Sequence, residues 1–103
     1  MENPVPYTHS YEEVAASQTD QILGANGKVG DLLERVIISV NTAATGTCSI
    51  KDGNGSAIPL TAANTPIGVY VVEVRARCRN ATTPGWKVTT GAGATAVGVG
   101  LFR

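Results

Sequence analysis

The sequence predicts an all-β fold: a single β-sandwich of about seven to nine strands, preceded by an extended N-terminal arm. The chain has 103 residues, which suits one hydrophobic core. Aromatic residues make up only 5% of it, so the core has to be built from Val, Ile, Leu and Ala, which pack well on pleated sheets. Turn signals rich in Gly, Asn and Pro recur at the roughly 8–12-residue spacing typical of a sandwich.

The arm is assigned to residues 1–13 and the sandwich domain to residues 14–103. Pro4 and Pro6 fix φ and remove two backbone donors, so the chain up to about Ser10 is expected to lie outside the core. The following stretch, VAASQTDQIL, favours a strand, although a short helix from Tyr11 to Ala16 is the alternative.

The segment LLERVIISV is the most strand-like run in the chain. It carries apolar side chains on both faces, so we expect a central strand or one that lies under an interface. Strict alternation places these residues on two sides: Val36, Ile38 and Val40 on one, Leu33 and Ile37 on the other.

A hairpin is predicted next. In TCSIKD, alternation points Cys48 and Ile50 inward. The turn DGNGSA leads into a short return strand, AIPL, and Pro59 marks that strand as an edge because proline cannot donate to a ladder.

The longest predicted strand runs from about Ile67 to Arg79. One face is continuously apolar: Tyr70, Val72, Val74, Ala76 and Cys78. The opposite face changes along the strand from apolar to charged: Ile67, Val69 and Val71, then Glu73, Arg75, Arg77 and Arg79. The three arginines therefore project away from the core.

Two more strands close the domain. WKVTTG places Trp86, Val88 and Thr90 on one side. ATAVGVGLF has Val97, Val99 and Leu101 on one face and small residues on the other. Gly98 and Gly100 leave room there for another backbone or a second subunit to approach closely.

Charge is unevenly distributed although the formal net charge is zero. Residues 1–34 carry six carboxylates and one lysine, whereas residues 35–103 carry seven cations and two carboxylates. The stripe Arg75, Arg77 and Arg79 has three possible roles: a solvated face, a charge ladder with N-terminal carboxylates between sheets or subunits, or nucleic-acid contact. Nucleic-acid contact is the least favoured because the domain is neutral and no aromatic residue interleaves.

The sequence offers little for catalysis, metal binding or a cofactor. His9 is the only histidine and lies in the predicted arm, so no catalytic triad is expected. Cys48 and Cys78 are too few and too far apart for a zinc set, and we expect two buried thiols, with a mutual disulfide as the alternative. No apolar run is long enough to span a membrane, and the stretch MENPVPYTHSYEE has neither the basic n-region nor the apolar h-region of a signal peptide, so cytoplasmic synthesis is expected.

The stretches ERVIISVNTAATGTCSIKDGNGSAIPL and WKVTTGAGATAVGVGLF resemble the capsid decoration (cement) proteins of tailed bacteriophages, which have jelly-roll-like sandwiches. The resemblance implies a non-enzymatic virion protein, made in the host bacterial cytoplasm. Such a protein binds the outer capsid surface and bridges coat subunits. Its partners would be the major capsid protein, copies of itself, or both, without nucleic acid, membrane or cofactor.

The residues predicted to bind these partners come from the arginine stripe and the arm: Arg75, Arg77, Arg79, Pro4, Pro6 and Tyr7. The alternative function is a receptor-binding or carbohydrate-binding module of a head or tail appendage. Sugar-binding platforms usually expose Trp and Tyr, and this chain has few of either.

Overall fold

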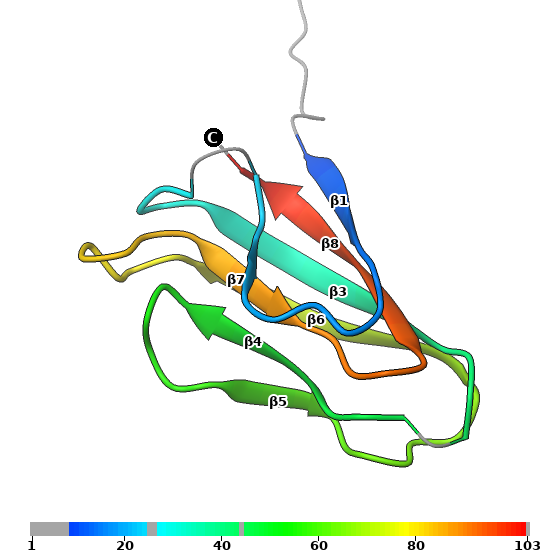
Figure 1. The fold of residues 1–103 in the computed structure, drawn as a ribbon. Helices are drawn as coiled ribbons and strands as arrows, with labels where there is room; N and C mark the ends of the chain where they lie inside the picture. The colour runs from blue at the N-terminus through cyan, green and yellow to red at the C-terminus, as the bar shows by residue number, and fades with distance from the viewer. Residues whose placement is uncertain (1–8, 25–26, 44, 103) are drawn as a thin grey trace, which may run out of the picture.

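The computed structural model describes residues 9–24, 27–43 and 45–102, and it confirms the predicted all-β sandwich (Figure 1). Eight strands form two four-stranded sheets. The strands are β1 (Ser10–Val14), β2 (Gln21–Ile22), β3 (Leu32–Val40), β4 (Cys48–Asp52), β5 (Ile58–Thr61), β6 (Gly68–Arg77), β7 (Trp86–Thr89) and β8 (Ala94–Leu101). Across the described residues there is no helix of the length and apolarity that a membrane span requires.

The first sheet has the strand order β1-β8-β3-β6 and the second has the order β2-β7-β4-β5. Every pairing is antiparallel, and four of them are nested: β1 with β8, β2 with β7, β3 with β6 and β4 with β5. The chain is thus folded like one long hairpin distributed over two sheets. The predicted central position of β3 and edge position of β5 are confirmed.

A β-bulge in β3 interrupts the alternation of its side chains. Leu33 pairs with Gly100 of β8, and Arg35 already pairs with the adjacent Val99, so β3 has one extra residue at this point. Leu33 and Val36 consequently both face the core and are fully buried, although they lie three positions apart.

The faces predicted for β3 are therefore partly wrong. Val36, Ile38 and Val40 lie in the core as expected. Leu33 was expected to share the opposite face with Ile37, but the bulge shifts the phase of the strand and turns Leu33 inward. Only Ile37 keeps the outward direction.

The small residues of β8 face the core, and this closes a space that was expected to admit another subunit. Ala94, Ala96, Gly98 and Gly100 are buried, while the bulkier residues between them point away. Leu23 of the same chain packs over Gly98, where an added Cβ would lie 2.8 Å from Leu23 Cδ1. Another backbone or a second subunit was expected to approach Gly98 and Gly100 closely, and the first alternative is confirmed at Gly100, where the backbone of Leu32 and Leu33 lies against the glycine. The second alternative is wrong, because Leu23 and the backbone of β3 occupy that space.

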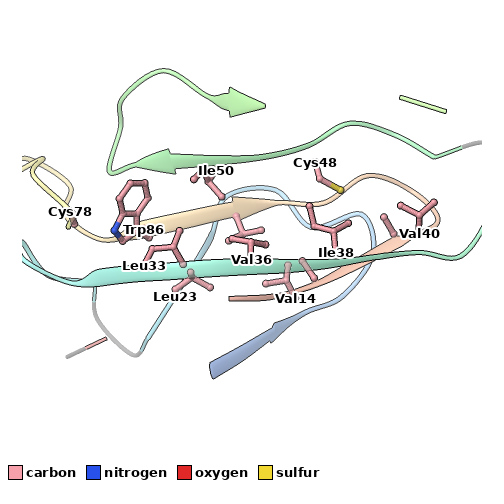
Figure 2. Close-up of a cluster of buried hydrophobic side chains, with 13 residues drawn as sticks. Val14, Leu23, Leu33, Val36, Ile38, Val40, Cys48, Ile50, Cys78 and Trp86 are labelled. Carbon is pink, nitrogen blue, oxygen red and sulfur yellow. The ribbon is translucent and has the colours of Figure 1, made fainter. Parts of the chain in front are cut away.

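The core lies between the two sheets, where Leu33, Val36 and Ile38 of β3 face the strands that carry Ile50 and Trp86 (Figure 2). Polar contacts join the sheets at one end of this layer. The backbone carbonyl of Asp31 accepts hydrogen bonds from Trp86 Nε1 (3.1 Å) and from the backbone N–H of Cys78 (2.8 Å).

Both cysteines are free and buried, as predicted. The buried Cys78 Sγ accepts a hydrogen bond from the backbone N–H of Gly85 at 3.0 Å. Both thiols therefore act as small core side chains.

The N-terminal strand begins earlier than predicted. Ser10–Val14 pairs with β8, so the last four residues of the expected arm belong to the sheet. Neither the helix Tyr11–Ala16 nor a continuous strand over residues 14–23 is present, because β1 ends at Val14 and β2 joins the other sheet. Pro4, Pro6 and Tyr7 lie outside the described residues.

Truncating the two residues that the bulge separates should have unequal effects. We expect Leu33→Ala to lower the free energy of unfolding by about 2–5 kcal/mol, because it leaves a cavity in the core. Ile37→Ala is the matched control on the outward face of the same strand, and it should cost less than about 1.5 kcal/mol. Urea denaturation of both variants measures this, and equal losses would contradict the observed phase of β3.

Candidate functional site

The outer face of the first sheet, opposite the core, combines exposed apolar side chains with a group of charged ones. Directly paired residues form an apolar row across three strands, with Val97 of β8 next to Ile37 of β3 and Ile37 next to Val71 of β6. We call the following residues the aliphatic patch: Ile37, Ile67, Val69, Val71, Val97 and Val99.

The patch is most exposed where it reaches β6. Val69 and Val71 keep 67% and 55% of their surface accessible, and Ile67, just before the strand, keeps 65%. Single exposed apolar side chains are ordinary, but a continuous group of them is a candidate interaction surface.

A charged cluster lies beside the patch on the same sheet. Arg35 Nε lies 3.1 Å from Glu73 Oε2, and Arg75 Nε lies 3.3 Å from Glu34 Oε1 and 3.4 Å from Glu73 Oε1. His9 Nε2 completes the cluster at 3.5 Å from Glu34 Oε2. The hydrogen bond from Arg35 lowers the pKa of Glu73, and the charge of Arg75 acts in the same direction. These pairs are open to solvent, so they organise the surface more than they stabilise the fold.

The arginine stripe points away from the core, as strand alternation predicts, and part of it is bound within the chain. Arg75 reaches Glu34, which belongs to the acidic N-terminal third, but this pair lies within one sheet, between β3 and β6, and not between sheets or subunits. Arg77 Nη1 donates a hydrogen bond to the carbonyl of Gly30 at 2.9 Å. The role of Arg75, Arg77 and Arg79 in binding a partner stays a prediction.

Arg75 has a backbone conformation that is unusual for a side chain of its size. Its φ is 51°, in the left-handed region, and it lies where the pairing of β3 with β6 shifts register. The irregularity breaks the regular hydrogen-bonding edge of β6 at this residue. It separates an apolar first half of β6 from a basic second half.

Asp52 holds the end of the stripe in place. Its carboxylate accepts hydrogen bonds from the backbone N–H of Arg79 at 3.0 and 3.1 Å and from that of Asn80 at 3.2 Å. Burial tends to raise the pKa of Asp52, but the Cys78 thiol and the two backbone donors outweigh it, so the pKa lies below its usual value.

The described residues contain no group of three His, Cys, Asp or Glu side chains placed to hold a metal ion. Burial raises the pKa of the Cys78 thiol, which makes it a poor nucleophile. An open hollow of about 410 Å³ beside the paired strands β1 and β8 is lined by Glu13, Val14, Ala15, Thr95, Ala96 and Val97.

Comparison with protein-family models, with curated proteins and with solved structures finds no match to this chain. Its function therefore has to be argued from the arrangement of its own residues.

The aliphatic patch was only partly visible in the sequence. Alternation along the strand containing Val69 and Val71, and along the one containing Val97, showed apolar residues on a second face. Their union into one surface depends on the register between strands distant in sequence, which alternation alone does not specify.

Replacing Asp52 by asparagine should destabilise the protein at neutral pH and not in acid. Asp52→Asn removes a charged acceptor from two backbone donors, and we expect a loss of about 1.5–3 kcal/mol at pH 7. The pKa of Asp52 is lowered in the folded state, so its contribution is present above the unfolded-state value of 3.8 and is lost as pH falls through the folded-state pKa. Denaturation curves from neutral to acidic pH should show the two proteins converging, and a pH-independent difference would contradict this account.

Proposed function

We propose that this protein is a structural component of a tailed-bacteriophage virion, which binds the outer capsid surface and stabilises the shell by bridging coat subunits. The observation that carries the proposal is the nesting of the strand pairs, β1 with β8, β2 with β7, β3 with β6 and β4 with β5. A hairpin rolled over two sheets of four strands supports a jelly roll, an architecture common in viral capsid and lectin domains.

Fold analogy alone does not assign a function, so the surface has to support it. The aliphatic patch provides apolar area for a protein partner, and the arginine stripe beside it provides charge that can be paired across an interface. A mechanical role needs such contacts and no catalytic group.

A carbohydrate-binding or receptor-binding appendage module is the second candidate, because jelly rolls also occur in lectins. The aromatic side chains favour it less. Trp86 is buried in the core, and Tyr70 packs against the core with its hydroxyl bound to the carbonyl of Pro66 at 2.7 Å. Tyr11 is exposed, but a single exposed tyrosine among the described residues is a small platform for sugar stacking.

Reversing one charge of the stripe should impair attachment and leave folding intact. Arg77→Glu replaces attraction with repulsion at the interface, and we expect a loss of roughly 2–5 kcal/mol in binding. The free energy of unfolding should fall by no more than about 1.5 kcal/mol, because the exposed Arg77 loses only its hydrogen bond to the carbonyl of Gly30. Cosedimentation with capsids of the phage that encodes the protein measures the first quantity.

Lys87→Glu, on the second sheet, is the matched control and should bind normally. Binding by Arg77→Glu with wild-type affinity would show that the stripe is only a solvated face. A steep log-linear loss of wild-type binding with salt would instead favour contact with nucleic acid.

Removing the N-terminal arm should weaken attachment and not folding. We expect a variant that lacks residues 1–8, and with them Pro4, Pro6 and Tyr7, to keep its melting temperature and to bind capsids less tightly. The reason is that β1 begins only at Ser10, so the deletion leaves every described strand intact. A large fall in melting temperature together with unchanged capsid binding would reverse this assignment.

A further inference from the structure

The two sheets have four edges, and among the residues that the structure describes only β6 has no protecting feature over its first half. The other three are blunted in ways known to prevent unwanted strand pairing. β2 has two residues, β5 contains Pro59, and β1 carries Glu12 and Glu13. In addition, Gln21 Nε2 donates to the backbone carbonyl of Glu13 at 3.1 Å, which covers part of the β1 edge.

β6 has ten residues, and its first half contains neither a proline nor a charge before Glu73. Val69 and Val71 expose their outward side chains there, and Ile67 precedes them. Long, apolar, unprotected edges are the places at which another strand adds to a sheet.

The second half of β6 differs in both backbone and charge. Arg75 keeps 70% of its side chain accessible, and Arg77 and Arg79 are also exposed. The left-handed conformation of Arg75 interrupts the free edge of β6, so an added strand could pair regularly only with Gly68–Glu73. Beyond that point a bound strand would contact the guanidinium groups of the arginines and would not form a regular series of backbone hydrogen bonds.

We propose that β6 is the docking edge for an extended segment of a partner protein, which joins the first sheet as a fifth, antiparallel strand. Because β6 runs from apolar to basic, an antiparallel occupant has carboxylates in its N-terminal half, opposite the arginines, and apolar residues in its C-terminal half, opposite Val69 and Val71. Arg–carboxylate pairing supplies the specificity for such an occupant. The proposed function enters this inference at one point only, the identity of the partner protein that carries the segment.

A second copy of this chain fits the edge less well. Two β6 strands paired antiparallel through their first halves would place each Arg75 near the uncharged stretch that precedes Gly68, so the arginines would gain no carboxylate. Pairing of β6 with β1 of another copy meets an edge that Gln21 partly covers. Of the two β1 carboxylates, Glu12 is already bound to Gln21 Nε2 and to the backbone N–H of Gly24.

A pair of synthetic peptides tests the proposal. One has alternating Asp and Thr in its N-terminal half and alternating Val and Thr in its C-terminal half, and the other has the same residues in reverse order. We expect the acid-first peptide to bind about tenfold more tightly in fluorescence anisotropy and to slow amide hydrogen exchange in residues 68–73. Equal binding of both peptides, or no protection of β6, would overturn the proposal.

Variants locate the contact. The double variant Val69→Lys, Val71→Lys changes only exposed side chains, and it should weaken the acid-first peptide by about tenfold or more. Tyr11→Lys is the matched control, since Tyr11 is equally exposed, at 69%, on the opposite edge strand of the same sheet. Equal loss in both variants, or a β6-dependent dimer in sedimentation that the peptide does not displace, would also overturn the proposal.

The same variants separate this inference from the proposed function. Peptide binding at β6 by a protein that does not bind capsids would support the docking edge and remove the virion assignment. If the double variant Val69→Lys, Val71→Lys binds capsids as tightly as the wild type does, the virion assignment stands and the docking edge is overturned.

Discussion

The bulge in β3 is the constraint on which both faces of the first sheet depend. It inserts one residue opposite β8, and the chain on either side of it therefore points its side chains in opposite phase. Leu33 enters the core together with Val36, while Arg35 and Ile37 turn outward. Without the extra residue, the same sequence would place Leu33 on the outer face.

The bulge also determines how charge is arranged outside. It brings Glu34 within reach of Arg75, whose left-handed backbone lies at the matching irregularity of β6. The two irregularities together separate an apolar part of the outer face from a charged one. The composition of the core and that of the outer face are thus consequences of the same departure from regular pleating.

Close approach of the layers depends on the inward face of β8. Because this face has no large side chains, Leu23 packs directly on Gly98. A second contact joins the sheets: the backbone carbonyl of Asp31 accepts a hydrogen bond from the indole N–H of Trp86 on the other sheet. A domain of this size buries only a small apolar area, so its core alone specifies the packing of the two sheets weakly. The buried hydrogen bond between the sheets adds a directional contact, which limits how far one sheet can slide over the other.

The sequence by itself determined the all-β class, the edge position of β5 and the direction of the arginines, and it gave a central position of β3 as one of two alternatives. Each of these follows from local rules: a period of two along a strand, an apolar run on both faces, and a proline that cannot donate to a ladder. The burial of Cys48 and Cys78 was predicted in the same way.

Only the tertiary structure decided the phase of Leu33, the inward direction of Gly98 and Gly100, and the assembly of the aliphatic patch from Ile37, Val71 and Val97. A bulge is created by pairing with neighbouring strands, so it has no signature in the strand's own pattern. A row of small residues fits a core or an outer contact equally well until the segment that fills it is known, and here that segment carries Leu23, more than seventy residues away along the chain. Local periodicity defines the two faces of each strand, whereas long-range register decides which of them is buried and which is exposed.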